Sequence, residues 1–241
     1  MKTLRAIHTI YGFSVFIILF LLLLPFLLIP ILFPSQFRLI GIINRIWARL
    51  MFLFVFLPTQ IEIRGKLDPK RQYIFSPNHF SYLDIPTMGL NPINTIFVGK
   101  SSIGKVPLFG WMYSRLHITV NRASLKSKVN SLKQSLEAVD QGKSLIIFAE
   151  GGMIARRPPQ MSLFKDGAFR VAIEKQIPIV PVTIPFNWII LPDPENQLYA
   201  GKVKVIFHEP IETTGMTIAQ TDELKERVFN IIDKELKNEN R

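Results

Sequence analysis

The chain has 241 residues, a formal net charge of +11 and 48% hydrophobic residues, and its mean hydropathy of +0.25 is high for a water-soluble enzyme. This length accommodates one domain with a substantial core plus an appended segment. The absence of cysteine excludes disulfides, thiolate nucleophiles and cysteine-ligated metals. The basic residues are scattered and match no nucleic-acid-binding signature. We therefore expect no nucleic-acid partner and attribute the charge to attraction towards anionic lipid headgroups.

The chain begins with a long apolar stretch. No residue between Ile10 and Phe33 is charged, and as a helix this stretch is about 36 Å long, enough to cross a hydrocarbon core. We expect Pro25 and Pro30 to kink or interrupt the helix. The stretch is too long for the apolar part of a cleavable signal peptide, and no A-x-A-like site follows it. It therefore indicates a membrane anchor.

A second apolar stretch, residues 39–58, contains Arg45 and Arg49. Four positions apart, these arginines share one helical face, which favours a helix lying among lipid headgroups over one crossing the bilayer. Residues 1–58 contain no acidic residue and have basic residues on both sides of the first stretch, a pattern that favours a hairpin with both ends cytoplasmic. We predict a membrane-associating helical hairpin over 1–58 and a second domain over 59–241.

After Pro58, short β-like runs alternate with helical patterns. This alternation predicts an α/β domain whose mostly parallel sheet is flanked by helices. Helices are expected over 125–139, closed by Gly142, over 162–175, and over 221–237, capped by Thr221. The expected strands are 60–65, 72–77, 95–100, 117–122, 144–150, 177–185 and 202–210.

The stretch SPNHFSYLD (76–84) combines a histidine and an aspartate directly after a predicted strand. A neutral imidazole accepts a hydroxyl proton, and a nearby carboxylate fixes its tautomer. Positions five apart do not share a helical face, so such a pair needs His79 to lie before the helix, leaning back towards Asp84. The alternative is that Ser81-x-x-Asp84 is a capping box with a purely structural carboxylate. These nine residues alone leave both interpretations open.

Two glycine-containing stretches follow. GKSSIGKV (99–106) resembles a P-loop, but Val106 occupies the magnesium-binding Ser/Thr position and Pro107 blocks the helix that should begin there. Lys100, Lys105 and nearby amides remain able to hold a phosphate without nucleotide chemistry. IIFAEGG (146–152) ends a predicted buried strand in a carboxylate and two glycines, which allow a ligand to approach the backbone. An ordinary strand-to-loop turn with an exposed glutamate is the alternative.

The sequence offers no other reactive group. It has no G-x-S-x-G elbow for a serine nucleophile and no convincing metal-ligand spacing. His117 and His208 lie in strand-like runs, where core or surface roles are commoner than catalysis. If His79 is a base, we therefore expect it to take its proton from a substrate hydroxyl, with no metal.

In this order, the stretches resemble the motifs of the glycerolipid acyltransferase family of the bacterial PlsC type, which makes phosphatidic acid from lysophosphatidic acid. NHFSYLD resembles the N-H-x-x-x-x-D motif and HITVNR (117–122) the second motif, whereas FAEGG resembles F-P-E-G and IVPVTI (179–184) the fourth motif. LFKDGAF (163–169) also matches the run after the third motif. The resemblance spans most of 60–210 and includes the apolar hairpin.

The resemblance implies a reaction and roles for individual residues. His79 is the general base, Asp84 orients it, and an acyl group passes from acyl-ACP or acyl-CoA to the sn-2 hydroxyl of a lysophospholipid, without a cofactor. Backbone N–H groups near the first or third motif would stabilise the oxyanion. The residues implied in binding the acceptor are Lys100, Arg122, Glu150, Gly151 and Gly152. The implied location is the cytoplasmic face of a bacterial inner membrane, with membrane lipid as a partner.

The third motif departs from the family pattern F-P-E-G-T-R. Ala149 replaces proline, Gly152 replaces threonine, and Met153 replaces the arginine expected at the acceptor's phosphate. Arg156 or Arg157 would then supply the missing charge. Three alternatives stay open: a different lyso-lipid acceptor such as an amino-acid lipid, a non-catalytic membrane lipid-binding protein, and a P-loop nucleotidase.

Overall fold

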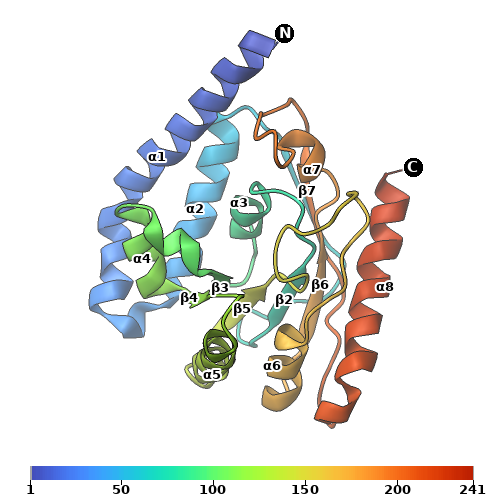
Figure 1. The fold of residues 1–241 in the computed structure, drawn as a ribbon. Coiled ribbons are helices and arrows are strands. Elements are labelled where there is room, and N and C mark those ends of the chain that lie inside the picture. The colour runs from blue at the N-terminus through green and yellow to red at the C-terminus, as the bar shows by residue number, and fades with distance from the viewer. Residues whose placement is uncertain (1, 241) are drawn as a thin grey trace.

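A seven-stranded sheet in the order β1-β7-β6-β2-β5-β3-β4 forms the centre of the computed structural model, which describes residues 2–240 (Figure 1). Strands β2 to β6 all run parallel, whereas β7 pairs antiparallel with β6 and parallel with β1. The predicted mostly parallel α/β fold is therefore confirmed. The strands are β1 (Thr59–Ile63), β2 (Ile74–Pro77), β3 (Thr95–Lys100), β4 (Ile118–Val120), β5 (Ser144–Ile147), β6 (Ile179–Thr183) and β7 (Val203–Phe207).

Helices cover both faces of the sheet (Figure 1). Successive residues of a strand point to opposite faces, so Ile74 and Leu145 pack with α5, α6 and α8, while Phe75 and Ile146 pack on the side of α3 and α4. The helices after the hairpin are α3 (Asp84–Gly89), η2 (Ser101–Lys105), α4 (Phe109–Leu116), α5 (Leu125–Asp140), α6 (Gly167–Lys175), α7 (Asn187–Ile190), η3 (Ile218–Gln220) and α8 (Thr221–Glu239).

The N-terminal hairpin consists of α1 (Lys2–Leu32) and α2 (Arg38–Phe54), joined by the short helix η1 (Pro34–Gln36). The two helices pack along each other (Figure 1). Within residues 2–240, the segment Thr3–Leu32 is long and apolar enough to cross a membrane, and only 28% of its most apolar window is buried. An apolar N-terminal helix of this kind suggests membrane association.

The prolines do not interrupt α1. The helix runs from Lys2 to Leu32 with Pro25 and Pro30 inside it, so of the two expected effects, a kink or an interruption, the structure excludes the interruption. Each proline removes a single N–H donor, and the remaining hydrogen bonds of a long helix maintain the element.

Arg45 lies elsewhere than the sequence predicted. Its guanidinium donates to the carbonyl oxygens of Asn91 and Pro92 at 2.8 and 2.9 Å, and to Asn94 Oδ1 at 3.2 Å. Arg45 therefore joins α2 to the loop before β3. The shared helical face was predicted correctly, but the backbone carbonyls of Asn91 and Pro92 bind one of the two arginines that were assigned to lipid headgroups.

Two helix boundaries also differ from prediction. The helix expected over 162–175 begins at Gly167, because the preceding residues form a loop in which the Ser162 N–H donates to Glu150. Thr221 does not cap α8. Its hydroxyl donates to the Ile218 carbonyl, and the capping box belongs instead to Thr217 and Gln220 one turn earlier.

Replacement of Arg45 tests its anchoring role. Arg45→Ala removes three hydrogen bonds from a charged donor and leaves the loop carbonyls unpaired, so the free energy of unfolding should fall by about 1–3 kcal/mol. Denaturant unfolding in detergent measures this change. Arg49→Ala is the matched control, since Arg49 is exposed on the same helix, and an equal loss in both variants would contradict the role.

Candidate active site

The predicted site residues converge because five neighbouring strands are parallel. The carboxyl ends of parallel strands lie at one edge of a sheet, where α/β proteins place ligand sites. His79 follows β2 by two residues, Glu150 follows β5, and Arg122 follows β4, while Lys100 ends β3. The fold thus brings all four positions to the same edge of the sheet.

His79 and Asp84 are in direct contact. His79 Nδ1 lies 3.0 Å from Asp84 Oδ2, and both side chains are buried. The same carboxylate oxygen accepts the backbone N–H groups of Phe80 and Ser81 at 2.8 and 2.9 Å. An oxygen that accepts several N–H groups is a carboxylate, so Nδ1 carries the imidazole proton and Nε2 presents its lone pair. No hydrogen bond to Nε2 forms within residues 2–240.

The capping and catalytic interpretations of this stretch are compatible. Asp84 is the first residue of α3 and reaches back to the N–H of Ser81, which is one half of a capping box. Ser81 Oγ accepts the N–H of Leu83 and donates to the carbonyl of Leu191. The contacts that fix the start of the helix therefore also hold the carboxylate in place for His79.

Two asparagines complete the frame around the pair. Asn187 in α7 donates to Asp84 Oδ1 and to Thr87 Oγ1, both at 2.9 Å. Asn78 exchanges two hydrogen bonds with the backbone of Ile184, joining the ends of β2 and β6. Asn187 was missed from the sequence; the signal was a single amide side chain in the apolar run PFNWII (185–190), just after a strand.

Glu150 supports His79 from the other side. Its oxygens accept the N–H of His79 at 2.9 Å and that of Ser162 at 2.8 Å, and the side chain is fully buried. Burial raises the pKa of the Glu150 carboxyl to about 7, against the opposing effect of these two hydrogen bonds. The His79 ring also stacks on Phe148, with centroids 4.0 Å apart. Glu150 and Phe148 at the third motif thus position the backbone and the imidazole ring of His79 in the first motif.

A cavity of about 570 Å³ opens beside this frame. Three cations line it: Lys100 at the end of β3, Lys105 in η2 and Arg122 after β4. The serines of η2 and Gly151 are also in its wall. Three cations and two hydroxyls suit an anionic, phosphate-like group. His79 and Asp84 are not part of the wall, but Gly151 adjoins Glu150 and so links the cavity to the pair.

The glycine of the third motif allows Arg122 to lie against the backbone. Gly152 has a φ of +153° and Gly151 one of +77°, both disfavoured for other residues. A Cβ atom built on Gly152 would lie 2.6 Å from Arg122 Nη1. Burial lowers the pKa of Arg122 from its usual value, but a guanidinium stays charged in proteins. The threonine of the family pattern would therefore displace this cation.

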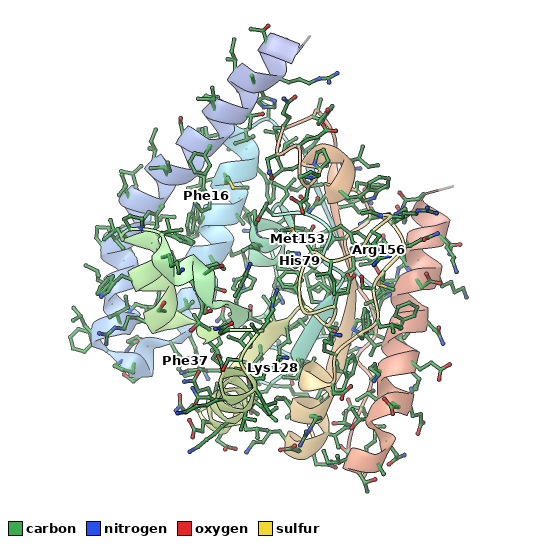
Figure 2. All side chains as sticks on the ribbon, in the orientation of Figure 1. Phe16, Phe37, His79, Lys128, Met153 and Arg156 are labelled. Atoms are coloured by element: carbon green, nitrogen blue, oxygen red, sulfur yellow. The ribbon has the colours of Figure 1, made fainter. Side chains whose placement is uncertain are left out.

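Arg156 and Arg157 are exposed and do not line the cavity. Figure 2 shows Arg156 on the α8 side of His79, whereas η2 adjoins α4 on the other side. Lys105, from the P-loop-like stretch, lines the cavity, whereas Arg156 and Arg157 do not. His208 is buried and His117 is half-buried, and burial lowers their pKa values to about 4 and about 3, in keeping with the core or surface roles predicted for them.

The fold and the site combine a buried imidazole–carboxylate pair with a neighbouring cavity lined by three cations. Comparison with known proteins identifies the class: residues 59–185 match the family model described as Acyltransferase. This match covers more than half of the chain, which therefore belongs to the acyltransferase family.

Individual relatives support this assignment. The chain is 29% identical over 205 residues to the chloroplastic 1-acyl-sn-glycerol-3-phosphate acyltransferase BAT2 of Brassica napus, covering 83% of this chain and 58% of that one. It is 33% identical over 164 residues to the 1-acyl-sn-glycerol-3-phosphate acyltransferase of Saccharomyces cerevisiae, covering 66% and 54%. The chain thus spans little more than half the length of these relatives.

A solved structure has the same fold. The crystal structure of the 1-acyl-sn-glycerophosphate acyltransferase PlsC from Thermotoga maritima superposes with a TM-score of 0.81 at 21% identity, over 98% of this chain and 96% of that one. At this identity the likeness concerns the fold, and it includes the N-terminal helices because nearly the whole chain is matched.

The buried Glu150 predicts a pH-dependent stability. With a pKa of about 7 when folded and 4.5 as the ordinary value, the folded chain binds more protons between these pH values, so the free energy of unfolding decreases as pH rises through this window. Glu150→Gln lacks this titration. Between pH 4.5 and 7, the free energy of unfolding of the wild type should therefore fall relative to that of the variant. Denaturant unfolding of both proteins at each pH measures this change.

A stability difference between wild type and Glu150→Gln that stays constant over this pH range would contradict the raised pKa of Glu150.

Proposed function

We propose that this protein transfers a fatty acyl group from an acyl thioester to the sn-2 hydroxyl of lysophosphatidic acid, giving phosphatidic acid. The observation that carries the proposal is the His79–Asp84 pair with a free Nε2, next to a cavity lined by three cations. The relatives are named 1-acyl-sn-glycerol-3-phosphate acyltransferases, which supports the same acceptor.

The chemistry follows from the tautomer of His79. Nε2 takes the proton of the acceptor hydroxyl, and the oxygen attacks the thioester carbonyl carbon to form a tetrahedral intermediate. Its collapse breaks the C–S bond, and the imidazolium returns the proton to the departing thiolate. Asp84 stabilises the imidazolium, and a positioned base of this kind contributes about 10²–10⁴ in rate. Acceptor and donor are bound together, and no acyl-enzyme forms.

Oxyanion stabilisation is assigned to the third motif. The backbone N–H groups of His79, Phe80 and Ser81 already donate to Glu150 and Asp84. The N–H of Gly152 makes no hydrogen bond within residues 2–240, and Gly152 adjoins Gly151 in the cavity wall. We assign the oxyanion contact to this group.

Lys100, Lys105 and Arg122 hold the acceptor's phosphate in this proposal. Gly151 is part of the wall, Gly152 leaves room for Arg122, and Glu150 positions His79. Acyl-ACP or acyl-CoA supplies the acyl group. Residues 1–58 associate with the membrane and residues 59–241 form the acyltransferase domain, at the cytoplasmic face. The acceptor and the product then stay in the membrane throughout the reaction.

His79→Ala tests the mechanism. The variant should lose activity by about 10²–10⁴, measured with radiolabelled lysophosphatidic acid and each thioester donor, while its unfolding curve and membrane association stay unchanged. His8→Gln is the control histidine, because His8 bonds only the Val55 carbonyl of the hairpin. Retained activity in His79→Ala would rule out general-base catalysis, and absence of thioester-dependent product in the wild type would favour a lipid-binding protein.

Gly152→Thr tests acceptor recognition. Threonine is the residue of the family pattern, but here it needs the space of Arg122 Nη1, so KM for lysophosphatidic acid should rise about tenfold or more, as for loss of one charged hydrogen bond. Turnover of a phosphate-free lyso-lipid should change much less. Lys133→Gln, an exposed cation of α5 outside the cavity, is the control. An equal effect on both acceptors would argue against a phosphate at Arg122.

A further inference from the structure

The excess of basic over acidic residues arises in two segments of the chain. Residues 1–61 contain five basic and no acidic residues, and residues 85–136 contain seven basic and no acidic residues. The rest of the chain contains 17 basic and 18 acidic residues and is almost neutral. The two acid-free segments therefore supply the whole net charge, and an anionic partner is attracted to the part of the molecule that they form.

These two segments pack against each other. Helix α4, from the second segment, lies against α1 in Figure 1. Phe109 at the start of α4 inserts among three rings of the hairpin, those of Phe16, Phe20 and Trp47, at centroid distances of 5.8, 5.3 and 6.2 Å. The basic region is thus continuous with the apolar helix that suggests membrane association.

The turn into α4 exposes large apolar side chains beside this contact. Val106, Leu108 and Trp111 are 49%, 47% and 45% exposed; we call these three residues the α4 tip. Leu108 has a φ of +61°, a conformation that costs free energy in a residue other than glycine. Single exposed apolar residues are ordinary, but a tryptophan grouped with two aliphatic side chains among cations is typical of a bilayer interface.

The packing beneath the α4 tip is rigid. A Cβ atom on Gly110 would lie 2.5 Å from the backbone of Gly104, so η2 and α4 are in close backbone contact, and the N–H of Gly110 donates to the Val106 carbonyl. This contact holds the turn in its strained form with the apolar side chains outward. The tip is therefore a fixed surface and not a loose loop.

We infer that the α4 tip is a second lipid-contacting surface, which inserts at headgroup depth in an anionic bilayer beside α1. The tip directly follows Lys100, Ser101, Ser102 and Lys105, which line the cavity. Its insertion brings the wall of the cavity to the level of the lipid phosphates, so a lysophospholipid reaches the site without leaving the membrane. This inference rests on the proposed membrane association of α1 and on a lipid acceptor.

Cysteine labelling tests the inference without any assay of catalysis. Since the natural chain has no cysteine, Val106→Cys carries a single environment-sensitive fluorophore on the full protein. Ile218→Cys, in η3 and 43% exposed, is the matched control, and Leu21→Cys, exposed on α1, reports the hairpin. Vesicles of phosphatidylethanolamine and phosphatidylglycerol, with and without nitroxide-labelled lipid, provide the membrane.

The labels at positions 106 and 21 should shift to the blue on vesicle addition and be quenched by the nitroxide lipid, whereas the label at position 218 should not respond. A response at position 21 with none at position 106 would overturn the inference and leave the hairpin and the proposed reaction standing. No response at either position would overturn both membrane contacts.

Activity gives a second measurement. Trp111→Ser should raise KM several-fold for lysophosphatidic acid presented in vesicles and leave turnover of a short-chain, water-soluble lysophosphatidic acid unchanged, since Trp111 is not part of the cavity wall. An equal loss on both forms of the acceptor would show a structural defect and overturn the role of Trp111. Absence of turnover in the wild type would instead refute the proposed function.

Discussion

The buried carboxylate of Asp84 is the interaction on which the site depends. It accepts hydrogen bonds from four donors, two of them backbone N–H groups, one from α7 and one from the His79 ring. A buried carboxylate is costly unless such donors surround it. The same four bonds tie the loop after β2 to the start of α3 and to the segment after β6. The hydrogen bonds that hold these segments together are therefore the same ones that orient the His79 imidazole.

Glu150 has a similar structural role on the opposite side of His79. Its two oxygens bind backbone N–H groups from separate segments, so one carboxylate fixes the imidazole while the other fixes the backbone that carries it. The N–H groups of His79, Phe80 and Ser81 are therefore engaged within the protein. In the third motif the N–H of Gly151 donates to the Phe148 carbonyl, whereas that of Gly152 makes no hydrogen bond within residues 2–240.

The sequence predicted the strands, the parallel sheet and the His–Asp pair, because hydrophobic periodicity and short motifs are local signals. What it missed depends on contacts between distant residues. Asn187 is 103 positions from Asp84, and nothing adjacent to it indicates a partner. Arg45 was assigned to lipid because its partners, the carbonyls before β3, have no sequence signature. One miss has a local cause: Thr221 failed as a cap because the competing capping box of Thr217 and Gln220 lies one turn earlier.

The departures in the third motif form a consistent set once the cavity is considered. Loss of the arginine at Met153 removes a cation from the loop, and Lys105 of η2 lies in the cavity wall. Loss of threonine at Gly152 gives Arg122 room against the backbone. Both changes shift the positive charge from the third motif towards β3, η2 and β4. These elements belong to the acid-free segment that packs on the hairpin, so the cations that line the cavity and those of the hairpin lie in adjoining regions of positive charge.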